Sequence, residues 1–184
     1  AVAIFYYMLA PEWEAWASVY SAAQGSWGPP AQLGPSSEDI FNFPNAAIDD
    51  AGVAYAIWQT MTADSRQTHA AAYDPGAQAW TAPETLDGGG GTHWPQITAI
   101  EGDGALALWT EEDALAQVLW MRRFSTQTGT WGDPWQLVAA DDGVSLNNPR
   151  FAEDGNADVH VIWTQGVSGM PSTAWAASCE AIEI

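Results

Sequence analysis

Apolar residues occur in short runs that turn-forming residues separate, and the same order of runs repeats along the chain. One run of each copy ends on an aromatic residue, as in 53–58, 105–109 and 158–163, and 1–5 fits the same position. The first two of these runs are apolar at nearly every residue, which is the pattern of a strand that is covered on both faces. The sequence therefore predicts sheets that stack face to face.

A second feature of each copy is a tryptophan that opens a W-x-x-P-x-x-L pattern. These tryptophans are Trp27, Trp80 and Trp131, at spacings of 53 and 51 residues. A further short run starts at Pro44, Pro95 and Pro149, and it ends at a turn rich in Asp and Gly, which is typical of a hairpin. The chain thus contains a repeat of about 52 residues with four short strands. We name them A (from the proline), B (ending on the aromatic), C, and D (from the tryptophan).

Four strands per repeat without a helical period are typical of one blade of a β-propeller. We therefore predict an all-β chain of four-stranded antiparallel blades, about three and a half of them. The blades are assigned to 1–34 (strands B, C and D), 43–87, 94–138 and 149–184 (strands A, B and C). Propellers close with about four to eight blades. The chain is therefore expected to be one propeller domain within a longer repeat protein. Pairing of its open blade ends with another chain is the alternative.

The chain is strongly acidic, with 23 Asp and Glu residues against four Lys and Arg, and its net charge is −19 at pH 7. Such a surface repels nucleic acid and anionic lipid headgroups, so neither is an expected partner. No apolar run reaches the roughly 18 residues that span a bilayer, so membrane insertion is not expected. The single Cys179 cannot form a disulfide within the chain. The predicted location is extracellular or at the cell surface, with the periplasm as an alternative.

The turn between strands C and D carries a family resemblance. It reads YDPGAQAW at 73–80 and STQTGTW at 125–131. Together with the proline that opens strand A, this turn resembles the tandem bacterial repeats related to Asp-box and sialidase-type propellers. The Gly and Trp of the Asp box are present, whereas the second of these turns lacks the Asp. The resemblance implies a propeller fold but no single function, because propellers host hydrolases, lectins and scaffolds.

The sequence offers little for catalysis. A sialidase needs a cluster of arginines, and only Arg150 of the four arginines starts an inner strand A. A two-carboxylate glycosidase needs one acid of raised pKa, and the adjacent pair Glu111 and Glu112 is predicted to be two solvated charges. His69, His93 and His160 lack a zinc-binding spacing. No enzymatic activity and no cofactor are therefore predicted.

A bound calcium ion is the alternative to the prediction that the chain has no cofactor. Asp154, Asn156 and Asp158 alternate as the oxygen ligands of calcium loops do. The equivalent turns of the other copies lack this alternation. We therefore predict an ordinary hairpin turn here, and calcium binding stays open as the alternative.

Tryptophans that recur in the repeat are predicted to pack in the core or between blades. They are Trp27, Trp80, Trp131, Trp58, Trp109 and Trp163. Aromatics that do not recur point to binding loops, and the B–C and D–A connections share one face of a propeller. The predicted ligand-binding residues on that face are Tyr6, Trp13, His93, Trp94, Glu111, Asn147 and Arg150. Aromatic rings beside amides and carboxylates are typical of sugar binding.

The predicted function is non-enzymatic binding of a carbohydrate or a protein on this variable loop face. One alternative is a propeller similar to sialidases or glycoside hydrolases, with catalytic residues partly outside this chain. A structural or assembly subunit is the second alternative.

Overall fold

The computed structural model describes residues 1–184 except 10, 11, 35–38, 41, 42, 62–65, 90, 101–103, 114, 115, 154–157 and 180–184. The regular structure of the described residues is entirely β, as predicted. Within them, no helix has the length and apolar character needed to cross a membrane.

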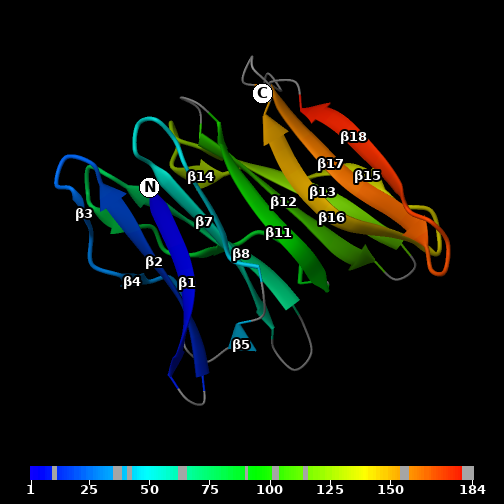
Figure 1. The fold of residues 1–184 in the computed structure, drawn as a ribbon, viewed down its shortest axis with the longest axis horizontal. Helices are drawn as coiled ribbons and strands as arrows, with labels where there is room; N and C mark the ends of the chain where they lie inside the picture. The colour runs from blue at the N-terminus through cyan, green and yellow to red at the C-terminus, as the bar shows by residue number, and fades with distance from the viewer. Residues whose placement is uncertain are drawn as a thin grey trace.

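Four antiparallel sheets follow one another along the chain, and each draws its strands from one continuous stretch (Figure 1). The first sheet contains β1 (Val2–Leu9), β2 (Glu12–Ser21), β3 (Ser26–Trp27) and β4 (Ala31–Gln32). The second contains β5 (Asp39–Ile40), β6 (Asn45–Ile48), β7 (Ala54–Met61), β8 (Arg66–Asp74), β9 (Ala79–Trp80) and β10 (Glu84–Thr85). The third contains β11 (Thr92–Ile100), β12 (Gly104–Asp113), β13 (Ala116–Ser125), β14 (Thr130–Trp131) and β15 (Trp135–Ala139). The fourth contains β16 (Val144–Glu153), β17 (Val159–Val167) and β18 (Thr173–Cys179).

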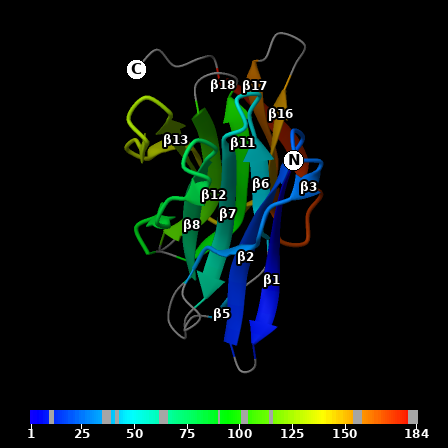
Figure 2. The same ribbon diagram turned by 90° about the vertical axis from the view of Figure 1, so that its left-hand side faces the viewer.

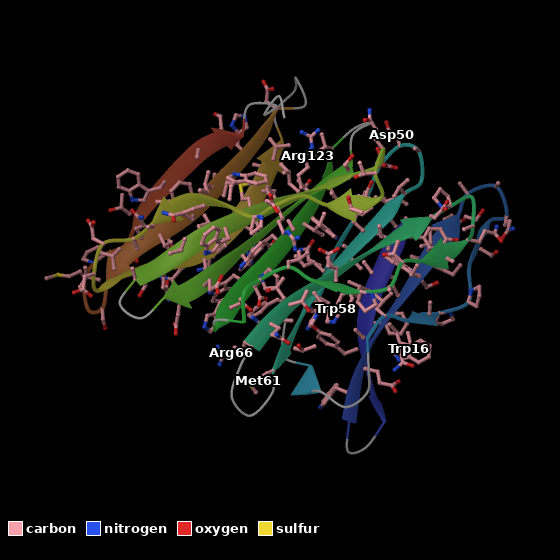
Figure 3. All side chains as sticks on the ribbon, turned by 180° about the vertical axis from the view of Figure 1, so that it is seen from behind. Trp16, Asp50, Trp58, Met61, Arg66 and Arg123 are labelled. Atoms are coloured by element: carbon pink, nitrogen blue, oxygen red, sulfur yellow. The ribbon has the colours of Figure 1, made fainter. Side chains whose placement is uncertain are left out.

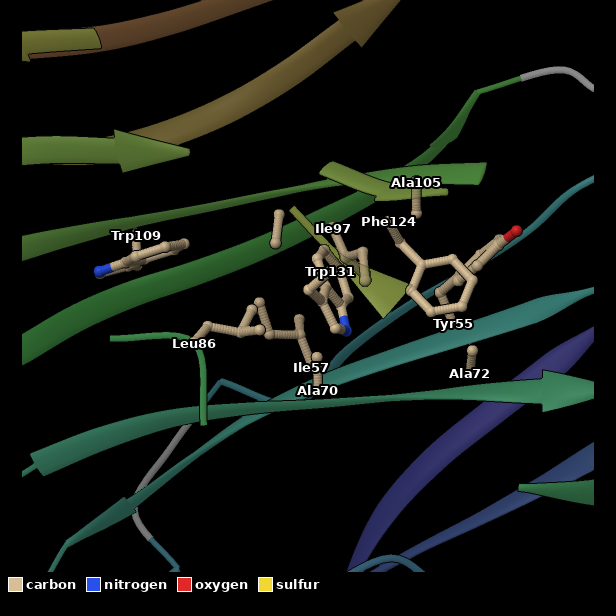
Figure 4. Close-up of a cluster of buried hydrophobic side chains, with 11 residues drawn as sticks. Tyr55, Ile57, Ala70, Ala72, Leu86, Ile97, Ala105, Trp109, Phe124 and Trp131 are labelled. Carbon is tan, nitrogen blue, oxygen red and sulfur yellow. The ribbon is translucent and has the colours of Figure 1, made fainter. Parts of the chain in front are cut away.

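The sheets stack face to face, and three clusters of buried apolar side chains fill the spaces between them. The cluster between the second and third sheets joins Tyr55 and Ile57 of β7 to Trp109 of β12 (Figure 4). Neighbours along β7 point the other way, so Ala56 and Trp58 pack against the first sheet. The strands β7 and β12 are thus covered on both faces, which confirms the prediction from their continuous apolar runs.

Cross-strand pairs keep the same register from sheet to sheet. Trp58 of β7 pairs with His69 of β8, and their rings stack with centroids 5.8 Å apart. The next sheet pairs Trp109 with Trp120 in the same way. Residues that lie directly opposite each other on antiparallel strands share a face of the sheet. Each pair therefore points toward the preceding sheet.

The prediction that every recurring tryptophan is packed is wrong for Trp27. Trp131 has 8% of its surface exposed, whereas Trp27 has 51% exposed. Trp131 packs against the second sheet, and Trp80 packs in the same sense against the first. Trp27 belongs to the first sheet, where no described strand of the chain lies in front of it (Figure 2). The physical reason is the missing cover, because the local strand structure is unchanged.

Candidate functional site

The strand register shows where the connections lie. Thr92, the first residue of β11, pairs with Glu111 near the end of β12. Glu111 pairs with Val118 of β13, which also pairs with Ala139 at the end of β15. The B–C connection and both ends of the D–A connections therefore lie at the same end of this sheet. We call it the loop end.

An unusual backbone conformation marks the start of each strand A. Phe43, Trp94 and Asn148 directly precede the three prolines, and their φ angles are 77°, 57° and 50°. Positive φ is uncommon for residues other than glycine. In β11 and β16 this residue lies within a β-bulge, and bulges redirect side chains.

A threonine holds each of these two bulges. The Thr110 hydroxyl donates to the His93 carbonyl at 3.1 Å, and the Thr164 hydroxyl donates to the Asn147 carbonyl at 3.2 Å. The redirected Trp94 ring lies against Phe43, with ring centroids 4.7 Å apart. Trp94 is therefore in contact with another ring and only partly exposed.

The seven predicted binding residues are distributed over three sheets. Tyr6 and Trp13 belong to the first sheet, His93, Trp94 and Glu111 to the third, and Asn147 and Arg150 to the fourth. Trp13 and Arg150 are exposed. Tyr6 packs toward the second sheet, and its hydroxyl has no hydrogen-bond partner among the described residues. Burial accordingly raises the pKa of Tyr6.

His93 meets charged side chains at the loop end between the second and third sheets. Arg66 of β8 donates to His93 Nδ1 at 2.8 Å, and Glu112 Oε1 lies 3.6 Å from His93 Nε2. Burial lowers the pKa of His93, the charge of Arg66 lowers it further, and the charge of Glu112 opposes both. A neutral imidazole at pH 7 is consistent with Nδ1 accepting a hydrogen bond from Arg66.

Asp87 organises the loop that follows β10. Its carboxylate accepts hydrogen bonds from the backbone N–H groups of Thr68 and Gly89. Gly89 has a φ of +88°, a conformation that L side chains rarely adopt. Burial raises the pKa of Asp87 to about 6; the two backbone donors oppose this rise, and the charge of Glu111 adds to it. Glu111 Oε1 lies 3.9 Å from the position that a Cβ on Gly88 would take.

Asp87 and Glu111 line a pocket of about 430 Å³ between the second and third sheets. The third sheet forms one wall with Trp109 and Glu111 of β12 and Trp120 and Arg122 of β13, and Asp87 comes from the second-sheet side. The Trp109 N–H is buried without an acceptor among the described residues. Figure 4 shows this nitrogen at the end of the ring that points away from the apolar cluster. The pocket thus combines aromatic side chains and two carboxylates, and the buried Trp109 N–H shares its lack of an acceptor with the equivalent Trp58 and Trp163.

Arg122 fixes this wall to the neighbouring sheet. Its guanidinium donates to the Gly132 carbonyl at 2.6 Å within the third sheet. It also lies 3.1 Å from the Glu84 carboxylate and 3.3 Å from the Thr85 carbonyl of the second sheet. The spacing between the two walls is therefore set by a charged link as well as by apolar packing.

Sequence reasoning missed most of this pocket and found only Glu111. Trp109 was assigned to the core, and Trp120 and Arg122 were not considered. One signal was available at the residue that follows the leucine of W-x-x-P-x-x-L, where Gly34 in one copy is replaced by Asp87 in the next. A Cβ on Gly34 would lie 3.5 Å from Trp58 Nε1, so the two interfaces differ at this point.

A larger groove of about 950 Å³ separates the outer parts of the first and second sheets. Alanine, glycine and proline dominate its lining, which contains no charged side chain. In the described part of the chain, no group of three His, Cys, Asp or Glu residues could hold a metal ion. Of the three residues considered for calcium, Asp158 is exposed, and Asp154 and Asn156 lie outside the described residues.

Neither a family model nor a curated protein matches the sequence. Solved structures do match the fold. A protein of unknown function from Dyadobacter fermentans DSM 18053 has a TM-score of 0.63 at 16% identity, over 96% of this chain and 49% of its own. The chain thus spans about half the length of that protein. An endo-arabinase from Bacteroides thetaiotaomicron VPI-5482 has a TM-score of 0.54 at 11% identity, over 96% of this chain and 70% of its own.

A third structure, described as NanB plus Optactamide, has a TM-score of 0.53 at 10% identity, over 92% of this chain and 26% of its own. The endo-arabinase and NanB are both propeller proteins. This chain has a β-propeller fold. The propeller part of the resemblance drawn from the C–D turns is therefore confirmed. At identities of 10–16%, the similarity to these structures shows the fold and nothing further.

Proposed function

We propose that this propeller binds a carbohydrate, without chemical conversion, in the pocket between the second and third sheets. The observation that carries the proposal is the pairing of Trp109 and Trp120 with the carboxylates of Asp87 and Glu111 around one cavity. Apolar faces of sugar rings stack on aromatic side chains, and their hydroxyls bond to carboxylates and N–H donors. Its volume of about 430 Å³ lies in the range of small-molecule sites.

The state of the polar groups supports binding over catalysis. Both oxygens of Asp87 already accept a backbone N–H, which suits a carboxylate that shapes a loop and accepts further hydroxyl donors. Trp120 is the more exposed of the two tryptophans, since Trp109 is only 1% exposed, so the Trp120 ring is the surface on which a sugar would stack. One structural neighbour is an endo-arabinase, so the propeller fold accommodates a carbohydrate in at least one known protein.

Binding to a glycan array, followed by titration calorimetry with the strongest glycan, tests the proposal. Trp120→Ala is expected to weaken binding by at least about tenfold, the loss of roughly 1.4 kcal/mol. Trp175→Ala is the matched control, because Trp175 pairs with Trp163 as Trp120 pairs with Trp109. Binding that survives Trp120→Ala but is lost in Trp94→Ala or Arg150→Ala would move the site to the inner strands and refute the pocket.

Hydrolysis of a glycoside is the second candidate, because one specific observation favours it. Burial raises the pKa of Asp87 to about 6 beside the charged Glu111, and an acid of raised pKa next to an ionised carboxylate is what glycosidases use. Release of nitrophenol from nitrophenyl glycosides would reveal this activity. If the wild type releases nitrophenol and both Asp87→Asn and Glu111→Gln abolish that release, hydrolysis replaces simple binding as the function. If no nitrophenyl glycoside of a bound sugar is cleaved, the binding proposal stands.

A further inference from the structure

The pocket between the second and third sheets differs in charge from the equivalent places in its neighbours. Glu111 stands two residues after the buried tryptophan of β12, and the equivalent residue is Thr60 in β7 and Gln165 in β17. The loop after β10 brings Asp87 to the pocket, whereas Gly34 is its counterpart in the first sheet. Neither carboxylate therefore belongs to the packing pattern that the copies share. In repeat folds, differences between copies point to binding.

The two carboxylates of this pocket repel each other. Burial raises the pKa of Asp87, and the charge of Glu111 raises it further. Among the described residues that line the pocket, Arg122 is the only cation. Its guanidinium already lies 3.1 Å from the carboxylate of Glu84, which is not a lining residue. The pocket therefore carries an excess of negative charge, and a cationic group on a ligand would offset the repulsion.

The aromatic wall favours an organic cation over a metal ion. The residues that the structure describes include no group of three His, Cys, Asp or Glu that could hold a metal, and two carboxylates supply only part of the six to eight oxygens that calcium takes. The ring of Trp120 is partly exposed, and a protonated amine is attracted to the face of an indole ring. Carboxylates also bind an ammonium group through charge-assisted hydrogen bonds. The same lining thus suits both a sugar ring and an amine attached to it.

We propose that the pocket selects an amino sugar, whose protonated amine binds Asp87 and Glu111 while its ring stacks on Trp120. This inference rests on the carbohydrate binding proposed above and names the class of sugar. An N-acetylated sugar lacks the positive charge, and an acidic sugar is repelled by both carboxylates. The net charge of −19 also attracts cations to the whole chain. A test must therefore separate the charge of the pocket from the charge of the chain.

Titration calorimetry with a series of β-1,4-linked disaccharides tests the proposal. The series consists of the dimers of glucosamine, N-acetylglucosamine and glucose, which differ only in the substituent at carbon 2. At pH 7 and low ionic strength, the glucosamine dimer is expected to bind at least about tenfold more tightly than either neutral dimer, because hydrogen bonds to charged groups are the stronger ones. Asp87→Asn and Glu111→Gln are each expected to reduce this preference about fivefold, since an amide keeps an acceptor for hydroxyls but carries no charge.

Asp50→Asn is the matched control for the charge of the chain. Asp50 is exposed in the turn before β7, at the opposite end of the second sheet from Met61 and Arg66 (Figure 3). This variant removes the same unit of charge as Asp87→Asn and is expected to retain the full preference for the amine. Circular dichroism shows whether each variant keeps its sheets. If Asp87→Asn does not fold, Glu111→Gln still decides the question.

The outcomes separate this inference from the function on which it rests. If the three dimers bind equally and Trp120→Ala weakens all of them, the pocket binds carbohydrate but does not select an amine. If the preference survives in both carboxylate variants, or falls as much in Asp50→Asn, it arises from the charge of the whole chain, and the inference is overturned. It is also overturned if no dimer binds while the glycan array selects a sugar without an amine. If no sugar binds at all, the proposed function fails together with the inference.

Discussion

Trp27 and Trp131 open the same W-x-x-P pattern and yet meet opposite surroundings. Each ring packs against the aromatic residue paired with it on the neighbouring strand, with ring centroids 5.6 Å apart for Tyr20 and Trp27 and 5.5 Å apart for Phe124 and Trp131. The local geometry of the two sites is therefore the same. Only Trp131 has a preceding sheet to pack against. The comparison shows that the repeat sequence sets the structure within a sheet, whereas burial of this tryptophan depends on contact with the preceding sheet.

The strongest test of this difference replaces each ring in turn. Trp131→Ala is expected to lower the free energy of unfolding by about 3–5 kcal/mol, because it opens a cavity between two sheets. Trp27→Ala is expected to cost less than about 1 kcal/mol in the monomer, as for exposed positions. Urea denaturation at low protein concentration measures both. Equal losses at the two positions would contradict the assignment of burial to the neighbouring sheet.

Arg122 sharpens the comparison at the interface between the second and third sheets. Arg122→Ala is expected to destabilise the chain by about 1–3 kcal/mol, because it removes charge-assisted hydrogen bonds to both sheets. Arg150→Ala is the control, since Arg150 is exposed and donates to the carbonyl of the adjacent Pro149 at 2.8 Å. Thermal unfolding of the two variants gives the difference. A loss at Arg150 as large as that at Arg122 would show that net charge, and not the link between sheets, is responsible.

Trp94 of β11 gives a smaller contrast in stability with Trp131. Trp94 has a φ of 57° and touches Phe43, so its replacement removes ring contact without opening a cavity between sheets. Trp94→Ala is expected to cost about 1 kcal/mol, much less than Trp131→Ala. The midpoint of urea denaturation measures this loss. A loss of 3 kcal/mol or more, on the scale of core truncations, would place Trp94 in the core.

Much of the fold was predictable because its signals are local. The continuous apolar runs that became β7 and β12 indicated strands covered on both faces, and Trp58 and Trp109 are buried as predicted. The exposure of Trp27 was not predictable from its repeat position, because the pattern does not state whether a sheet precedes it. The left-handed conformation of Phe43, Trp94 and Asn148 was also missed, since residues before proline usually adopt extended backbone.

The candidate site was less accessible to sequence reasoning than the fold. Glu111 was selected because it lies at a strand end, but Asp87 is brought to it from another sheet. Trp120 and Arg122 occupy alternate positions of β13 and line the pocket only because of the register with β12. Such contacts depend on the stacking of two sheets about 10 Å apart, and no local pattern encodes them.

The smallest expected effect concerns Asp87. Its counterpart at the interface between the first and second sheets is Gly34. Burial raises the pKa of Asp87 to about 6 from an ordinary value of 3.8. Between these two pH values the folded chain binds more protons at this group than the unfolded chain does. The contribution of Asp87 to the free energy of unfolding therefore falls as pH rises from about 4 to about 6, and it is constant above that range.

Asp87→Asn removes this group from the titration. The difference in unfolding free energy between wild type and variant is expected to change steadily from pH 4 to 6 and to level off above 6, in favour of the variant as pH rises. Asparagine also loses one acceptor for the N–H groups of Thr68 and Gly89, which shifts the whole curve without altering its slope. The slope is therefore the informative quantity, and chemical denaturation at several pH values gives it. Gly34 carries no titratable group at the equivalent position. If the unfolding free energy of Asp87→Asn changes with pH from 4 to 6 as steeply as that of wild type, the pH dependence arises elsewhere, and Asp87 has no part in the account of this interface.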